Sequence, residues 1–448
     1  MPPRFAATIA IALSIASPLH AGPRCTALAD HPLAVAGSVT AQAAGGACRI
    51  EGVLRPVAGS RIGYRLWLPE SERWTGRLQM LGNGGYSSDM PLAAMEAALA
   101  RGNAVVATDT GHNGDDPAFA RDAPQAIVDW GWRAVHLTIV AAKALTTRFY
   151  GKPPTHSYFT GCSTGGHQAM MEAQRFPADF DGIVAGAPGA DRVRLNAAFL
   201  WQFLANHRPG DDAHPILNAA DLKLLQDHAL RRCRSAGNAA SRWLVDPLSC
   251  RPDPQVLQCR PGETSDCLSP EKVAAARRMY AGARDPLTGK QLTFPYLPGS
   301  ETGWSSYWAD PRQPDQPARV GFWRWWAFTP GWTWRNADIA TTVMQAQARL
   351  SPVIDATDPD LGAFRNRGGK LLQYHGLADP VVSPLDTLHY RARVAQQLGS
   401  DRRALDRWYQ LVLIPGMGHC GGGPVPGPRD LATSIEQWVE HGTAPKRL

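Results

Sequence analysis

A serine between glycines is the first residue of this sequence whose type and spacing could do chemistry. Gly161, Ser163 and Gly165 fit the pattern G-x-S-x-G. In that pattern a sharp turn from a strand into a helix exposes the serine hydroxyl above a sheet, and small residues let the backbones pass closely. Residues 157–160 predict a short strand, and residues 168–175 predict a helix. We therefore expect a nucleophile at Ser163, with an ordinary glycine-rich turn as the alternative.

A serine hydroxyl needs a general base near neutral pH, and the base needs an acid that orients it. His419 lies in a glycine-rich loop after a predicted strand at 409–414, and Asp379 follows a predicted strand at 370–374. The order serine, acid, histidine is that of α/β-hydrolases. Asp386 is the alternative acid, but it lies further from the strand end, where a helix is expected to begin.

Hydrolysis of an acyl group also needs two backbone N–H groups that point at the developing oxyanion. The N–H after the nucleophile belongs to Thr164. A glycine-rich loop follows the predicted strand at 78–81 and offers the second donor, with Gly85 as the first choice and Gly84 as the second. A hairpin turn is the alternative explanation of that loop.

The elements that would position these residues show a regular alternation. Strand-like and helical segments alternate from about residue 64 to 190 and again from about 370 to 441, which predicts a mainly parallel sheet with helices on both faces. Residues 191–360 carry four cysteines, many prolines and most of the tryptophans without this alternation. We therefore expect an α/β-hydrolase fold at 22–190 and 361–448, interrupted by an inserted domain at 191–360.

Composition and the N-terminus indicate a secreted globular protein. The 448 residues are 44% hydrophobic and 19% charged, and the net charge of +7 is scattered, which does not favour a nucleic-acid partner. Residues 1–21 have a basic start, a short apolar run and a plausible cleavage site, which predicts a signal peptide. No later stretch approaches about 18 apolar residues, so we expect no membrane span and a secreted or periplasmic location.

Eight cysteines behind a secretory signal predict disulfides. They form no paired CxxC motifs, which does not favour a zinc site. Eight cysteines allow 105 pairings, and the sequence alone does not choose among them. Proximity suggests three local pairs and leaves two cysteines far apart in the chain: Cys25 with Cys48, Cys233 with Cys250, and Cys259 with Cys267, leaving Cys162 and Cys420.

The sequence resembles the tannase and feruloyl esterase family, which also contains mono(hydroxyethyl) terephthalate hydrolases. The resemblance covers nearly the whole mature chain. The matching stretches include 82–85, 107–112, 161–166, 186–188, 322–334, 376–379 and 419–420. The adjacent pairs Cys162-Ser163 and His419-Cys420 are the most specific of these. The resemblance implies Ser163, Asp379 and His419 as a catalytic triad, a disulfide between Cys162 and Cys420, and an inserted domain that acts as a lid shaping the acyl pocket.

One segment departs from the family pattern. Family lids often carry a calcium loop in which aspartates stand at the first, fourth and eighth places after a cysteine. After Cys233 these places hold Arg234, Gly237 and Ser241. Calcium needs several oxygen ligands, usually carboxylates. We therefore expect no metal, and nothing in the sequence indicates a cofactor.

The inserted segment is rich in aromatic residues that could stack on a phenolic or benzoic ring. Trp304, Trp308, Phe322 and Trp326 are the candidate substrate-binding residues, and a role in the lid core is the alternative for each. Asp109 and His112 could line the site or brace a loop.

These residues together predict a secreted serine carboxylic ester hydrolase that acts on small esters of aromatic acids, such as hydroxycinnamic or gallic acid. An α/β-hydrolase peptidase shares the triad chemistry and is one alternative. A catalytically silent binding protein on an esterase scaffold is the other, although an intact triad argues against it. The particular ester and the oligomeric state are left open by the sequence.

Overall fold

A nine-stranded mixed sheet organises the part of the chain that the computed structural model describes, which is residues 21–234, 242–306 and 320–445. The strand order is β1-β2-β3-β5-β4-β6-β7-β8-β9. The strands are β1 (Gly37–Ala44), β2 (Ala47–Leu54), β3 (Ile62–Pro69), β4 (Arg77–Leu81), β5 (Ala104–Thr108), β6 (His156–Cys162), β7 (Gly182–Gly186), β8 (Lys370–Gly376) and β9 (Tyr409–Ile414).

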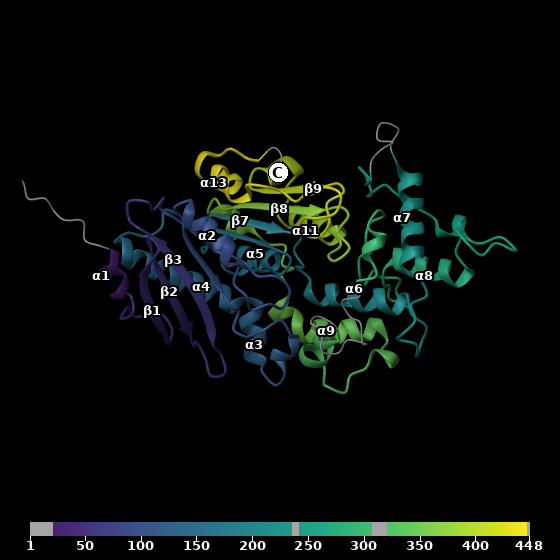
Figure 1. Ribbon diagram of the computed structural model, residues 1–448, viewed down its shortest axis with the longest axis horizontal. Helices are drawn as coiled ribbons and strands as arrows, with labels where there is room; N and C mark the ends of the chain where they lie inside the picture. Colours follow the sequence, from purple (N-terminus) through teal and green to yellow (C-terminus); the bar gives the residue numbers. More distant parts are fainter. Residues whose placement is uncertain (1–20, 235–241, 307–319, 446–448) are drawn as a thin grey trace, which may run out of the picture.

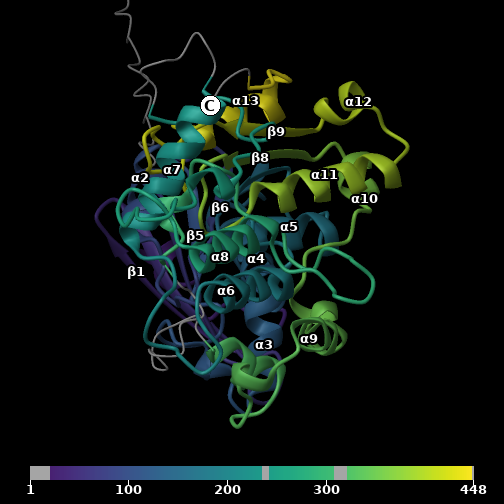
Figure 2. The same ribbon diagram turned by 90° about the vertical axis from the view of Figure 1, so that its right-hand side faces the viewer.

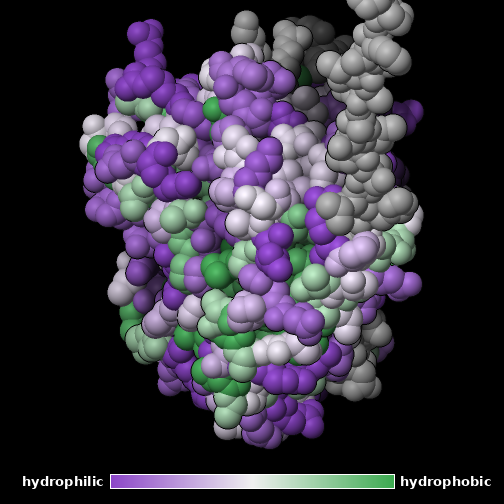
Figure 3. Space-filling view, turned by 90° about the vertical axis from the view of Figure 1, so that its left-hand side faces the viewer, coloured by the Kyte–Doolittle hydropathy of each residue, from purple (hydrophilic) through white to green (hydrophobic). Residues whose placement is uncertain are grey.

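The direction of the strands divides the sheet in two. From β5 to β9 each neighbouring pair is parallel, as the alternation of strands and helices predicts. The pairs β1–β2, β2–β3 and β3–β5 are antiparallel. The hairpin of β1 and β2, which the sequence analysis did not predict, extends the sheet at its N-terminal edge (Figure 1). Viewed from that side, hydrophobic residues are interspersed among hydrophilic ones (Figure 3).

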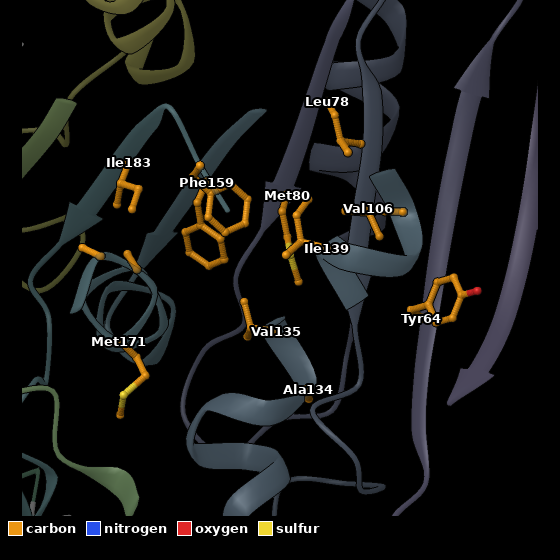
Figure 4. Close-up of a cluster of buried hydrophobic side chains, with 14 of the residues drawn as sticks. Tyr64, Leu78, Met80, Val106, Ala134, Val135, Ile139, Phe159, Met171 and Ile183 are labelled. Atoms are coloured by element: carbon orange, nitrogen blue, oxygen red, sulfur yellow. The ribbon is translucent and has the colours of Figure 1, made fainter. Parts of the chain in front are cut away.

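Helices cover both faces of the sheet. One face packs against α4 (Ala134–Tyr150), α5 (Thr164–Arg175) and α11 (Pro384–Gln397), and the other against α2 (Leu92–Ala100) and α13 (Leu431–His441). Alternate side chains of a strand serve the two cores, so Phe159 belongs to the α4–α5 side and Tyr158 to the α13 side. Figure 4 shows Met80, Val106 and Phe159 extending from the sheet toward the helices.

A long insertion between β7 and β8 combines α-helices with irregular segments in its described part. It contains α6 (Arg192–Ala205), α7 (Ala219–Cys233), α8 (Pro270–Ala281), α9 (Ile339–Ile354) and α10 (Gly362–Asn366). Helix α6 packs on both α8 and α9. Figure 1 shows these helices below and to the right of the strands β7–β9, and Figure 2, viewed from that side, shows α6 and α8 in front. The described chain also contains three short α-helices, namely α1 (Ala21–Thr26), α3 (Pro124–Val128) and α12 (Arg402–Asp406), and several short 3-10 and π helices.

Four disulfides tie the chain together. The three local pairs expected from proximity are present, and the remaining bridge joins Cys162 to Cys420. The predicted signal peptide lies outside the described residues except for Ala21. Among the described helices, none has both the length and the apolar character needed to cross a membrane.

Candidate active site

Ser163 lies on a strained turn between β6 and α5. Its backbone has φ 59° and ψ −118°, a region that residues other than glycine rarely adopt. The Ser163 N–H donates to the Gly186 carbonyl at 3.0 Å, and the His167 N–H donates to the Ser163 carbonyl at 2.9 Å. A Cβ on Gly161 would lie 2.5 Å from the Gly165 carbonyl carbon, and a Cβ on Gly165 would lie 3.0 Å from the Asn83 carbonyl oxygen, so both positions favour glycine.

Asp379 and His419 form a hydrogen-bonded pair. His419 Nδ1 lies 2.8 Å from Asp379 Oδ2. The other carboxylate oxygen accepts the N–H groups of Val381 and Val382 at 2.8 and 3.0 Å. Burial alone would raise the pKa of Asp379, but the charge of His419 and hydrogen bonds from His375 and His419 outweigh it and hold the pKa well below its usual range. Asp379 is therefore ionised at neutral pH and suited to orient an imidazolium.

His375 is a neighbour that the sequence analysis did not single out. Its Nε2 lies 3.2 Å from Asp379 Oδ2 and 3.0 Å from the Val382 carbonyl, and its Nδ1 lies 2.8 Å from the Thr387 hydroxyl. The ring is fully buried. These contacts fix both Asp379 and the loop that follows it. A histidine four residues before the acid, at the end of β8, is the signal that could have indicated this role.

Ser163 and His419 line one cavity of about 470 Å³. The disulfide between their chain neighbours Cys162 and Cys420, whose Cα atoms are 5.9 Å apart, links the two loops. The structure thus brings together the three residues predicted to form the triad, with Asp379 buried behind His419.

The predicted oxyanion donors border the same cavity. Gly84, Gly85 and Thr164 all line it, and Gly85 has a left-handed backbone with φ 54°. The adjacent Asn83 fixes the loop, because its N–H donates to Gln168 Oε1 at 3.2 Å and its side-chain amide donates to the Thr108 carbonyl at 3.0 Å. Gln168 comes from α5, so the helix that follows the nucleophile also positions the opposite loop.

Helix α6 contributes the side of the cavity that sequence reasoning missed. Arg192, Leu195 and Phe199 follow an i, i+3, i+7 spacing and therefore share one helix face, and all three line the cavity. Val381 and Val382 line it from the loop after Asp379. The cavity thus has apolar sides with a single arginine.

The predicted aromatic residues lie elsewhere. Trp304, Phe322 and Trp326 are at most 2% exposed, and none of them lines the cavity. Trp304 packs in the core of α7 and α8, and Phe322 packs against Trp326, which stands behind Tyr86. These positions do not fit the expected role in substrate binding. Large apolar rings stabilise the fold most when they are fully buried, and here they are buried in the insertion. Trp308 lies outside the described residues.

Asp109 and His112 brace a loop. Asp109 accepts the N–H groups of Gly63 and Gly111, each at 2.8 Å, while His112 contacts the Tyr86 carbonyl through Nε2 at 2.6 Å. Neither residue lines the cavity. Asp386 lies in the first turn of α11 and makes no hydrogen bond to His419 within the described chain. Desolvation, followed by repulsion from Asp191, raises the pKa of Asp386 to about 7, which does not suit it to orient a cation.

Two places bear on metal binding. The segment where the family calcium loop would stand lies outside the described residues except for Arg234. His136, Glu172 and Asp179 group potential ligand atoms within 4.8 Å of one another, away from the cavity. Burial, reinforced by the nearby Asp179, raises the pKa of Glu172 well above its usual value. A protonated Glu172 needs no cation beside it.

The comparison with family models decides the relationship. The model described as tannase and feruloyl esterase matches residues 48–318 and 331–448. The chain belongs to the tannase and feruloyl esterase family. A probable feruloyl esterase B-2 of Aspergillus terreus is 31% identical, over 94% of this chain and 81% of that protein. The mono(2-hydroxyethyl) terephthalate hydrolase of Piscinibacter sakaiensis is 33% identical, over 90% of this chain and 77% of that protein.

Solved structures of this family agree with the fold. The crystal structure of feruloyl esterase B from Aspergillus oryzae superposes with a TM-score of 0.85 at 26% identity, covering 95% of this chain and 91% of that one. The fold is therefore that of the α/β-hydrolases, as the sequence predicts. The chain is a carboxylic ester hydrolase.

Proposed function

We propose that this esterase is a secreted serine hydrolase that cleaves esters of aromatic acids through an acyl-enzyme. The observation that carries the proposal is the hydrogen bond between His419 and the ionised Asp379 at the edge of the cavity that Ser163 lines. An aromatic acyl group in the substrate is supported by two relatives, a probable feruloyl esterase and a mono(2-hydroxyethyl) terephthalate hydrolase.

The geometry supports the following steps. Ser163 Oγ attacks the ester carbonyl while its proton passes to His419, and the carbonyl becomes an oxyanion that the N–H groups of Thr164 and Gly85 stabilise, with Gly84 as the alternative donor. The C–O bond to the alcohol then breaks as His419 returns the proton to the leaving oxygen. Water attacks the acyl-enzyme with His419 again as base, which releases the acid and restores Ser163.

The proposal also gives the insertion a role as a lid and the protein a location outside the cytoplasm. Residues 191–360 act as a lid, because α6 from this segment supplies one side of the cavity. Leu195 and Phe199 provide an apolar surface for an aromatic ring. The predicted signal peptide at 1–21 and the four disulfides support export to the periplasm or the medium.

A substrate panel tests the proposed function. Methyl gallate, methyl ferulate and mono(2-hydroxyethyl) terephthalate, assayed beside methyl acetate, should show a preference for at least one aromatic acid. A p-nitrophenyl ester and a peptide p-nitroanilide assayed in parallel distinguish an esterase from a peptidase. Higher kcat/KM for methyl acetate than for all three aromatic esters would reject the aromatic acid, and faster cleavage of the anilide would reject the ester class.

A further inference from the structure

Arg192 is a buried cation in the cavity that holds the proposed nucleophile. It is the first residue of α6 and is only 4% exposed, yet it lines the cavity. Its Nη1 donates to the Thr164 hydroxyl at 3.4 Å, a long hydrogen bond. Because Thr164 follows Ser163 directly, the guanidinium lies close to the reacting centre.

In the part of the chain that the structure describes, no carboxylate pairs with this charge. Within the described residues, no Asp or Glu oxygen lies within 4.0 Å of the Arg192 guanidinium, and its Nε has no hydrogen-bond partner. The adjacent Asp191 is engaged elsewhere, since it pairs with Arg194 at 3.1 Å and caps α6 through the Arg194 N–H. An arginine buried without a counter-ion is costly, so such residues are normally paired.

The other neighbours of Arg192 carry no negative charge and do not neutralise the guanidinium. The guanidinium lies over the rings of Trp130 and Tyr86, with centroid distances of 4.8 and 5.7 Å, an arrangement that stabilises a cation without neutralising it. Burial raises the pKa of Tyr86, so its phenol stays neutral. Burial, with the charge of Arg192 as a second cause, lowers the pKa of His167 to about 3, so that ring is neutral too.

We propose that Arg192 is an anion-binding subsite and that the preferred substrate is an ester whose aromatic acyl group carries a second, ionised carboxylate. This inference rests on the proposed ester hydrolysis and specifies its substrate. The aromatic ring packs on Leu195 and Phe199, and the carboxylate pairs with the guanidinium on the same face of α6. A guanidinium matches a carboxylate in shape and charge, and the pair excludes water from an apolar cavity.

The direct test compares charged and neutral esters of matched shape on the whole enzyme. The substrates are the three monomethyl esters of benzene-1,2-, -1,3- and -1,4-dicarboxylic acid, with methyl benzoate as the neutral reference. Wild type should hydrolyse at least one monoester with a kcat/KM about tenfold to a hundredfold above that of methyl benzoate, because the buried guanidinium gains a partner only from the charged ester. A preference for methyl benzoate over all three monoesters overturns the subsite.

Variants of Arg192 assign the preference to this side chain. Arg192→Met keeps much of the volume without the charge and should abolish the preference, mainly through a higher KM for the monoester. Arg192→Lys retains a cation and should keep part of it. Arg208 is an exposed arginine paired with Glu271, so Arg208→Gln removes the same formal charge at the surface and should leave the preference unchanged. Equal losses for charged and neutral esters in Arg192→Met, with a lower Tm, would show a purely structural role and overturn the proposal.

Two further outcomes are informative. Carboxymethyl benzoate, which carries its carboxylate on the alcohol, should gain no more than twofold over ethyl benzoate, and a larger gain confined to this ester would contradict the acyl-side assignment. If wild type hydrolyses none of these esters, including methyl benzoate and p-nitrophenyl acetate, the proposed ester hydrolysis itself fails. If it hydrolyses them without regard to charge, only the subsite fails.

Discussion

Cys162 and Cys420 are 258 residues apart in the sequence, yet a disulfide holds their Cα atoms 5.9 Å apart. Each cysteine adjoins a residue of the proposed triad, Ser163 in one case and His419 in the other. The bridge therefore fixes the distance between two loops that the rest of the sheet places only indirectly.

Removal of this bridge should lower kcat even under conditions in which the protein remains folded. Loop closure over this separation suggests a stability loss of up to about 5 kcal/mol for Cys162→Ala/Cys420→Ala. A shift of about 1 Å at the reacting atoms can cost roughly a hundredfold in rate. We expect kcat to fall at least tenfold at a temperature where circular dichroism shows a folded protein.

The control for that experiment is the bridge between Cys25 and Cys48, which joins α1 to β2 at the far edge of the sheet. Cys25→Ala/Cys48→Ala should lower Tm and leave kcat within about twofold of wild type. Equal kcat losses in the two double variants would contradict a positioning role for the Cys162–Cys420 bridge.

The choice of the acid can be tested by two matched substitutions. Asp379→Asn should lower kcat/KM by about two to four orders of magnitude, because an amide neither holds the required tautomer of His419 nor stabilises its cation. Asp386→Asn should stay near wild type, since Asp386 makes no hydrogen bond to His419. Kinetics on a p-nitrophenyl ester decide the matter, and full activity of Asp379→Asn beside an inactive Asp386→Asn would reverse the assignment.

Glu301 should make the stability of the insertion depend on pH. Its carboxylate is fully buried, and burial raises its pKa to about 7, although hydrogen bonds from the Tyr280 hydroxyl and the Gly299 N–H oppose the shift. A raised folded-state pKa gives stability that is complete below the unfolded pKa of about 4.3 and is lost as pH rises to about 7. The loss amounts to about 4 kcal/mol.

Glu301→Gln removes this titration. Urea unfolding from pH 4 to 8.5 should show the free energy of unfolding of wild type falling relative to the variant between about pH 4.5 and 7, then running parallel to it. The variant should be slightly less stable at pH 4, where the neutral carboxyl group already fits. Parallel curves across the whole range would mean that the pKa of Glu301 is the same in the folded and unfolded states, so that burial does not raise it.

Calcium chelation should change neither activity nor Tm. The places after Cys233 where family members carry aspartates hold Arg234, Gly237 and Ser241, which offer no carboxylate. Thermal unfolding in EGTA, with and without added calcium, is the measurement. A drop in Tm that calcium reverses would show a site built from other residues.

The proposed triad could be predicted because each member follows a predicted strand. The carboxyl ends of parallel strands lie at the same edge of a sheet, so residues that follow them come close together. Strand β1 was missed because its sequence, Gly37 to Ala44, is mostly small or polar and largely exposed. The cavity lining on α6 could not be predicted, because Leu195 and Phe199 line the cavity only through the way the insertion docks. The insertion tryptophans were placed in the cavity on chemical type alone, whereas packing buries Trp304 and Trp326.

The central claim is that Ser163 is the nucleophile of an acyl-enzyme mechanism. Reaction with a fluorophosphonate, followed by peptide mapping, tests it most directly. Wild type should carry one adduct per chain on the peptide containing Ser163, with activity lost in step. Ser163→Ala should fold normally, carry no adduct and lose hydrolysis by several orders of magnitude. An adduct on another residue, or ester hydrolysis that persists in Ser163→Ala, would contradict the mechanism.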